Sequence, residues 1–307
     1  MRRRVVVLDG GLSTALEEQG ADLSGSLWTA RLLADEPERV VAAHRAFYRA
    51  GAQVATTASY QASVEGFTAA GIDPADAARL VARSVSLARQ ARDEVSGEVS
   101  GEVVGEVADE RPGLRVAASV GPYGAFLADG SEYRGRYGVP ARRLRDFHRR
   151  RLELLAAAGP DLLAVETIPD LDEAAVLVPL LEEVGLPAWF SYSVRGSATC
   201  AGQPVAEAYA VLGGCRVLVA AGVNCSAQED VLGAVRSAVA ATGLPAVAYP
   251  NRGGHWDASA KRWEYADAVD LALVDEWVSA GAELVGGCCG TGPADIAALA
   301  RRVAGPR

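Results

Sequence analysis

Three cysteines of this chain have the residue type and placement for metal chemistry: Cys225 and the adjacent pair Cys288-Cys289. Three thiolates with one open position are typical of a catalytic zinc site, whereas structural zinc sites have four protein ligands. Neighbouring side chains on a strand point in opposite directions, so both members of the pair can reach one ion only if the backbone turns there. Glycines on either side of the pair permit such a turn.

Spacing alone leaves alternatives for these thiols, because they do not form a CxxC pair. Cys288 and Cys289 could be a redox-active pair, or all three residues could be buried free thiols. The other two cysteines, Cys200 and Cys215, are predicted to be small buried hydrophobic residues. Five cysteines in a chain of this size do not indicate a disulfide framework.

Two carboxylates, Asp9 and Glu166, could bind the ammonium group of an amino acid. Asp9 precedes Gly10-Gly11, and we expect free backbone N–H groups there to bind the carboxylate of the same ligand. Aspartate before two glycines also suits a turn or a helix cap, so that interpretation stays open. Glu166 lies in an apolar run, where a carboxylate without a partner would be costly to bury.

The elements that must position these residues are eight short apolar runs separated by amphipathic helical segments. Several runs are apolar on both faces, as buried parallel strands are. The runs are Val5–Leu8, Gln53–Thr57, Arg115–Val120, Leu162–Thr167, Ala188–Val194, Val217–Val223, Ala246–Tyr249 and Glu283–Gly286. Eight strand–helix units predict an α/β fold, a (β/α)8 TIM barrel in a single domain over 1–307, and an open doubly wound sheet is the competing fold.

Active sites of such barrels lie at the carboxyl ends of the strands, which is where the polar residues of this chain gather. Tyr60 follows the second run, Asn224 and Cys225 follow the sixth, and Asn251 follows the seventh. We expect Tyr60, Asn224 and Asn251 to contact substrate there. Only one strand separates the sixth strand from the eighth, so we expect Cys225 and the Cys288-Cys289 pair to converge at this rim.

Composition narrows the possible partners. The net charge of −9 argues against a nucleic-acid partner, and no apolar stretch is long enough for a signal peptide or a membrane span. We therefore expect a cytoplasmic protein. The acidic segment 94–112 repeats Gly-Glu-Val and is predicted to be a flexible insertion.

Longer motifs cover nearly the whole chain. They are LDGGLSTALEEQG (8–20), LWTARLL (27–33), YRAGAQVATTASYQAS (48–63), SVGPYGAFLADGSEYRGRYG (119–138), ETIP (166–169), GVNCS (222–226), YPNRGGHWD (249–257) and GGCCGTGPADIAAL (286–299). Together they resemble the homocysteine S-methyltransferases that use S-methylmethionine or S-adenosylmethionine, and the GVNC and GGCC motifs are highly specific. The segment 94–112 and Gly290-Thr291-Gly292 depart from the family pattern without removing a ligand.

The resemblance implies a zinc ion on Cys225, Cys288 and Cys289, and homocysteine bound by Asp9, Glu166 and the backbone of the two glycines after Asp9. In the related betaine-using enzymes, the residue matching Trp28 contacts the methyl donor. The residue matching Tyr60 can approach the zinc there when substrate is absent.

The expected activity is therefore methyl transfer from a sulfonium donor to the thiol of L-homocysteine, giving methionine. A zinc-bound thiolate would need no general base during the transfer. Other thiol or selenol acceptors, betaine as donor and a non-catalytic zinc- or thiol-binding barrel remain alternatives. We expect small-molecule partners only, and a monomer or a small homo-oligomer.

Overall fold

The computed structural model describes residues 5–23, 27, 29–102, 113–257, 262–265 and 269–305. Eight parallel strands form its central sheet: β1 (Val6–Val7), β2 (Val54–Thr56), β3 (Arg115–Val120), β4 (Leu162–Ile168), β5 (Ala188–Tyr192), β8 (Leu218–Asn224), β9 (Ala246–Tyr249) and β12 (Ala282–Val285). Every one of the eight predicted runs overlaps one of these strands, and the bounds differ by at most a few residues.

The sheet closes on itself. From β2 to β12, each of these strands pairs in parallel with the next one in the order above, and β12 pairs with β1. A parallel bridge between Leu8 and Val54 then joins β1 to β2. The predicted (β/α)8 barrel is therefore confirmed over the open doubly wound sheet, because an open sheet would leave β1 and β2 apart.

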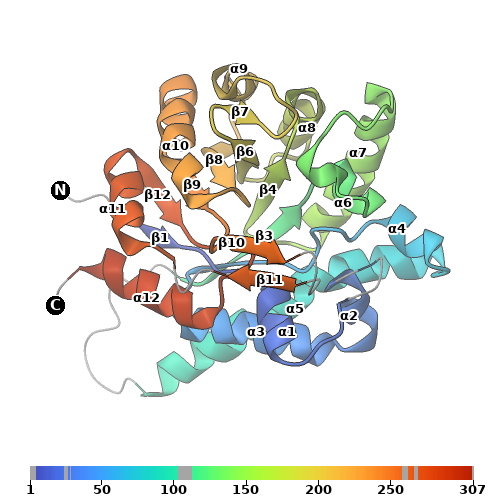
Figure 1. The fold of residues 1–307 in the computed structure, drawn as a ribbon. Helices are drawn as coiled ribbons and strands as arrows, with labels where there is room; N and C mark the ends of the chain where they lie inside the picture. The colour runs from blue at the N-terminus through green and yellow to red at the C-terminus, as the bar shows by residue number, and fades with distance from the viewer. Residues whose placement is uncertain are drawn as a thin grey trace.

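Helices surround the strands (Figure 1). They are α1 (Leu12–Glu18), α2 (Thr29–Asp35), α3 (Pro37–Arg49), α4 (Val64–Ala69), α5 (Pro74–Glu102), α6 (Tyr123–Leu127), α7 (Ala141–Ala157), α8 (Leu171–Val184), α9 (Val205–Ala210), α10 (Gln228–Thr242), α11 (Leu271–Ser279) and α12 (Pro293–Ala304), with a short 3₁₀ helix η1 (Ser131–Tyr133). Two hairpins, β6 (Val194–Arg195) with β7 (Ala198–Thr199) and β10 (Gly254–Asp257) with β11 (Arg262–Tyr265), complete the structure.

Local sequence explains where several helices begin and end. Pro37 and Pro293 stand in the first turn of α3 and α12, where a missing N–H costs no helical hydrogen bond. Gly185 and Gly243 end α8 and α10 in the left-handed conformation that glycine adopts without strain. Among the described residues, no helix has the length and apolar character needed to cross a membrane.

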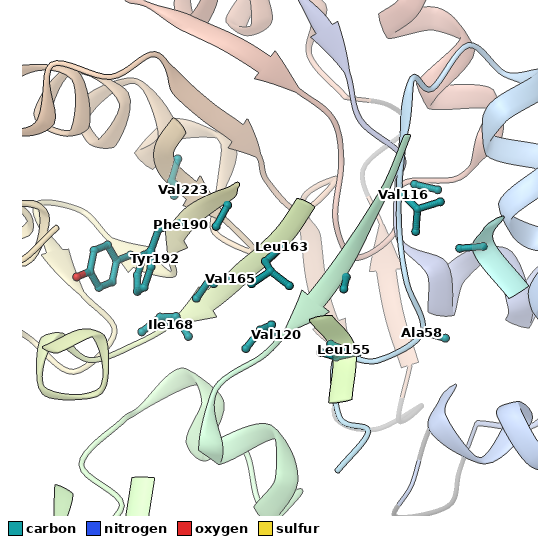
Figure 2. Close-up of a cluster of buried hydrophobic side chains, with 14 of the residues drawn as sticks. Ala58, Val116, Val120, Leu155, Leu163, Val165, Ile168, Phe190, Tyr192 and Val223 are labelled. Atoms are coloured by element: carbon teal, nitrogen blue, oxygen red, sulfur yellow. The ribbon is translucent and has the colours of Figure 1, made fainter. Parts of the chain in front are cut away.

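Alternate residues of each strand enter two separate cores. The larger core lies between the strands and the helices, and Figure 2 shows part of it, with Val116 and Val120 from β3, Leu163 and Val165 from β4, and Leu155 from α7. The smaller core fills the barrel interior and consists of Leu8, Val54, Ala117, Leu162, Ala164, Trp189, Ala220, Val247 and Tyr249.

The interior changes from apolar to polar along the strands. In β4, Leu162 and Ala164 belong to the interior core, so the strand's two-residue alternation directs Glu166 inward as well. The same alternation places Ser119 of β3 beyond Ala117 and Asn224 of β8 beyond Ala220. The carboxyl end of the barrel therefore carries a ring of inward-facing polar side chains.

The acidic segment 94–112 begins with structure that the sequence did not predict. Helix α5 continues to Glu102, so residues 94–102 are helical, and residues 103–112 lie outside the described residues. Two ion pairs hold this end of α5 to α3: Arg45 with Glu94 at 2.9 Å and Arg49 with Glu98 at 2.5 Å. Acidic repeats therefore did not exclude a helix, because cationic side chains of a neighbouring helix pair with them.

Candidate active site

Three sulfur atoms meet at the carboxyl end of the barrel. The Sγ atoms of Cys225, Cys288 and Cys289 all lie within 4.8 Å of one another, and those of Cys225 and Cys289 are 3.6 Å apart. Cys225 directly follows β8, whereas the pair lies just beyond β12, with only β9 between these strands. The strand order of the barrel thus brings the three thiols together, as the sequence predicted.

A tight turn directs both cysteines of the pair to the same place. The backbone N–H of Thr291 donates to the carbonyl of Cys288 at 3.1 Å, and Gly290 has a φ of 80°. A positive φ at the third residue is the mark of a type II turn and favours glycine. The N–H of Cys288 donates to the carbonyl of Pro250 at 2.8 Å. The N–H of Cys289 donates to the side-chain oxygen of Asn251 at 3.3 Å. Asn251 thus holds the turn in place.

Cys225 itself has a strained backbone. Its φ of 48° lies in the left-handed region, which costs a non-glycine residue about 1–2 kcal/mol. Its N–H donates to the carbonyl of Tyr249 at 3.2 Å, which anchors this conformation to the next strand. Such strain typically persists at functional sites, where the surrounding structure imposes it.

The pKa values of the three thiols shift in different directions. Hydrogen bonds from Cys225 and Cys288 hold the pKa of the Cys289 thiol well below its usual range. Hydrogen bonds with Cys225 and Cys289, together with burial, raise the pKa of Cys288 instead. Cys225 is buried, Cys288 is half-buried and Cys289 is exposed, so the cluster is open on one side. This donor set suits a thiophilic divalent cation, whose charge would favour ionisation of all three thiols.

Tyr133, in η1, completes the immediate surroundings of the thiols. Its hydroxyl lies 3.2 Å from the Sγ of Cys225. The charge of the Cys225 thiolate and burial raise the pKa of Tyr133 well above its usual range, so the hydroxyl keeps its proton and can donate to sulfur. The remaining cysteines, Cys200 and Cys215, do not belong to the metal-binding group found among the described residues.

The two predicted carboxylates are buried beside this cluster. Both oxygens of Asp9 accept hydrogen bonds from Thr56, one from its N–H at 2.7 Å and one from its hydroxyl at 3.0 Å. Glu166 accepts from the hydroxyl of Ser119 and, at 3.1 Å, from that of Tyr249. The costly burial that the sequence predicted for Glu166 is therefore offset by two hydroxyl donors.

Burial has the largest effect on the pKa values of Asp9 and Glu166. It raises the pKa of Asp9 to about 8 and that of Glu166 to about 7, while the hydrogen bonds from their partners oppose the shift. The charge of Glu166 further raises the pKa of Asp9, which places the two carboxylates within electrostatic reach of each other. A cation bound between them would be favoured, because it would compensate both buried charges.

One of the backbone N–H groups after Asp9 is already bonded within the protein. The N–H of Gly11 donates to the carbonyl of Thr291 at 2.9 Å, so it is not free to bind a ligand carboxylate. A methyl group on Gly11 would lie 2.6 Å from the Cys288 carbonyl, and one on Gly10 would lie 2.4 Å from that of Thr291. Both glycines therefore permit the close approach of the cysteine turn to α1.

Asn224 is also used within the protein. Its Oδ1 accepts from the N–H of Thr167 at 2.7 Å and from the hydroxyl of Ser191 at 2.8 Å, while its Nδ2 donates to the Thr167 hydroxyl at 2.8 Å. Its side chain is fully buried. The structure thus makes it a link between strand ends and leaves its side chain little capacity for the direct substrate contact that we expected.

Tyr60 lies near the thiols on the loop after β2. Its carbonyl accepts from the buried guanidinium of Arg151 at 2.5 Å, as the carbonyl of Gly121 does at 3.0 Å. Burial, followed by the charge of Cys225, raises the pKa of Tyr60, whose hydroxyl bonds with Thr167. Trp28, the expected donor contact, lies outside the described residues.

The predicted site residues did not include Tyr133, Tyr249 or Glu132. Tyr249 ends β9 and faces the interior, where its hydroxyl accepts from Trp189 Nε1 at 2.9 Å. Its position at the end of an apolar run was a usable signal. Tyr133 and Glu132 belong to the 119–138 motif, far from the cysteines in sequence, and the motif alone did not indicate how closely they approach the thiols.

Comparisons with known proteins agree with this geometry. The model of a family described as homocysteine S-methyltransferase matches residues 6–303. The chain is 44% identical to the homocysteine S-methyltransferase of Escherichia coli (strain K12) over 306 residues, covering 98% of this chain and 96% of that protein. It is 39% identical over 310 residues to a selenocysteine Se-methyltransferase of Brassica oleracea var. italica, covering 98% of this chain and 89% of the relative.

A solved structure shares both the fold and much of the sequence. The crystal structure of the homocysteine methyltransferase MmuM from Escherichia coli, in its metallated form, matches with a TM-score of 0.85 and 42% identity, covering 97% of this chain and 96% of that chain. The family model and these relatives extend over nearly all of the barrel, including the strand ends that carry the thiols. The chain therefore belongs to the homocysteine S-methyltransferase family.

Proposed function

We propose that this protein transfers a methyl group from a sulfonium donor, S-methylmethionine or S-adenosylmethionine, to the thiol of L-homocysteine, giving methionine. The observation that carries this proposal is the group of three thiols within 4.8 Å of one another in a chain of this family. The metallated form of the MmuM structure supports metal binding by this chain.

Cys225, Cys288 and Cys289 would hold the metal, which we propose to be zinc because three thiolates with an open side suit it. Zinc bound there would keep the acceptor sulfur as a thiolate, the nucleophilic form of a thiol. Asn251 and the turn around Gly290 keep the two adjacent cysteines on the same side of the site.

Asp9 and Glu166 are proposed to bind the ammonium group of homocysteine. Their hydrogen bonds to Thr56, Ser119 and Tyr249 fix both carboxylates, and an ammonium ion would offset the cost of ionising them in a buried place. Their orientation would place the acceptor so that its thiol reaches the cysteine cluster. Tyr60 and Trp28 are proposed donor contacts, since aromatic faces attract onium groups.

The reaction itself reduces charge. The sulfonium loses its positive charge when its methyl group leaves, and the acceptor sulfur loses its negative charge when the new bond forms. A buried site with few waters favours such a change and holds the two reactants in line. The raised pKa of Tyr133 keeps its hydroxyl protonated, so it can donate to sulfur and does not compete as a base.

The test is an assay of metal-loaded protein with homocysteine and each donor in turn: S-methylmethionine, S-adenosylmethionine and betaine. We expect methionine from a sulfonium donor and about one zinc ion per chain. Protein that binds zinc and homocysteine but turns over no donor would indicate a non-catalytic barrel instead. A reversible disulfide between Cys288 and Cys289 without metal would favour a redox protein.

A second acceptor deserves a parallel assay, because one relative is named a selenocysteine Se-methyltransferase. Selenocysteine is one methylene shorter than homocysteine and would place its selenol farther from the cysteine cluster if its ammonium occupied the same carboxylates. We therefore propose homocysteine as the better acceptor. The need for three reduced thiols also supports our prediction of a reducing, cytoplasmic location.

A further inference from the structure

Glu132, in η1, is a buried carboxylate that the steps above do not use. Its side chain is only 7% exposed, and its Oε2 atom is buried without a hydrogen-bond partner among the described residues. Burying an acceptor of this strength without a donor is unfavourable, so such atoms are rare in folded proteins. An incoming ligand with N–H groups would supply the missing donor.

The position of Glu132 connects it to the thiol site. The next residue, Tyr133, has its hydroxyl 3.2 Å from the Sγ of Cys225. The charge of Glu132 raises the pKa of Tyr60, and the charge of Cys289 acts in turn on Glu132. The carboxylate therefore lies within electrostatic reach of both a cysteine of the cluster and the tyrosine on the facing loop.

The segment around Glu132 packs closely against α6. A methyl group on Gly124 of α6 would lie 2.4 Å from the backbone nitrogen of Glu132, so the two segments are in close contact. The cation nearest in sequence, Arg134, is 65% exposed at its side chain and pairs with Asp129 at 3.6 Å. It therefore faces solvent and leaves the buried oxygen of Glu132 unsatisfied.

The charge of the reactants shows which group Glu132 would receive. Asp9 and Glu166 already provide two carboxylates for the ammonium of the acceptor. The donor carries two cationic groups, its sulfonium and the α-ammonium of its amino-acid part. A carboxylate against the sulfonium would stabilise the donor more than the transition state, because the positive charge disappears as the methyl group moves. The α-ammonium keeps its charge throughout, so binding it does not raise the barrier.

We propose that Glu132 binds the α-ammonium group of the methyl donor and so selects sulfonium donors that carry an amino-acid group. This inference rests on the proposed function, since it requires a sulfonium donor at the thiol site. It assigns specificity for the donor to the segment after β3, and specificity for the acceptor to the ends of β1 and β4.

The test compares two sulfoniums in Glu132→Gln and in the wild type. S-methylmethionine has the α-ammonium group, whereas dimethylsulfonioacetate lacks it. Each is titrated calorimetrically into metal-loaded protein without homocysteine, so that binding is measured without turnover. We expect E132Q to weaken binding of S-methylmethionine by about 10- to 100-fold, the usual effect of losing a hydrogen bond to a charged group, and to leave dimethylsulfonioacetate unchanged.

Asp129→Asn is the matched control. It removes the same charge from the same loop at an exposed position, and its amide oxygen can still accept from the N–H of Ser131. We expect S-methylmethionine to bind D129N as it binds the wild type. Circular dichroism and zinc content of E132Q should also match the wild type, because the substitution keeps the shape of the side chain.

Two results would overturn the inference: unchanged binding of S-methylmethionine by E132Q, or equal weakening for both sulfoniums. A kinetic assay with homocysteine distinguishes failure of the ammonium site from failure of the proposed function. If the wild type forms no methionine although E132Q weakens binding selectively, the proposed function fails and the ammonium site stands. If turnover proceeds and E132Q has the same KM and kcat for S-methylmethionine, only the ammonium site is rejected.

Discussion

The side chain of Asn224 joins the ends of two barrel strands by accepting a hydrogen bond from the N–H of Thr167 at 2.7 Å. Asn224 immediately precedes Cys225, and Thr167 immediately follows Glu166. Thr167 has a φ of 59° and Cys225 a φ of 48°, so both linked strand ends contain a residue in the left-handed region. A single buried amide thus couples a metal-ligand candidate to a substrate-binding candidate.

Replacing Asn224 with alanine should therefore affect both halves of the site. The variant leaves the N–H of Thr167 without its partner, which costs about 1–3 kcal/mol of unfolding free energy. We expect weaker zinc binding and at least a tenfold loss of kcat/KM, measured by chelator competition and by methionine formation. Ser237→Ala, which removes an exposed helical hydroxyl, is the control. An N224A protein with wild-type zinc affinity and activity would show that this link is dispensable.

Each cysteine of the cluster should be necessary for metal binding and turnover. Cys225→Ala, Cys288→Ala and Cys289→Ala each remove one donor, so we expect zinc content to fall far below one ion per chain and methionine formation to be lost. Metal analysis and the donor assay measure this. Cys200→Ala should retain both, since its thiol lies outside the cluster. Methionine formation by a metal-free cluster variant would disprove the mechanism.

A methyl group on Gly11 should disrupt the cysteine turn. It would lie 2.6 Å from the Cys288 carbonyl and 2.9 Å from the Thr14 hydroxyl, closer than real contacts permit. We expect Gly11→Ala to reduce zinc affinity and to lower the midpoint of thermal unfolding. Gly97→Ala is the control, because Gly97 is exposed in α5 with open space around it. That substitution should stabilise the protein by up to about 1 kcal/mol through helix propensity. Equal stability of G11A and the wild type would contradict this account.

The buried carboxylates predict a specific pH dependence of stability for metal-free protein without substrate. Asp9 and Glu166 have ordinary pKa values of 3.8 and 4.5 when exposed, and about 8 and 7 when folded. Between these limits the folded state holds protons that the unfolded state has lost, so stability falls as the pH rises. The loss begins above about pH 4 and is complete once the pH exceeds about 8.

Asp9→Asn should remove part of this decline, because an amide does not ionise. Urea unfolding of the metal-free wild type and variant measures the difference at each pH, and the thiols titrate in both proteins. We expect the stability of D9N, relative to that of the wild type, to rise by about 1–3 kcal/mol between pH 5 and pH 9. A constant difference across this range would show that Asp9 is already ionised in the folded state. Adding homocysteine should reduce the wild-type decline if its ammonium binds there.

The sequence by itself determined the barrel and the place of its chemistry. Apolar runs and helical periodicity are local patterns, and they located all eight barrel strands because buried parallel strands need apolar residues on both faces. The order of strands in a barrel follows chain order, so cysteines after β8 and β12 had to lie near one another. Asp9 and Glu166 were found by the same reasoning, since each lies at a strand end.

Only the tertiary structure decided which groups are already bonded within the protein. Gly11 has its N–H occupied by Thr291 and Asn224 is bonded to Thr167, so neither has the free group that its motif suggested. Tyr133 and Glu132 lie in a segment far from Cys225 in sequence, and only the folded chain brings the Tyr133 hydroxyl to the Cys225 thiol. Hydrogen-bond partners far apart in sequence meet only when the barrel closes and its loops pack. Local sequence patterns therefore could not show which groups of the site are already bonded.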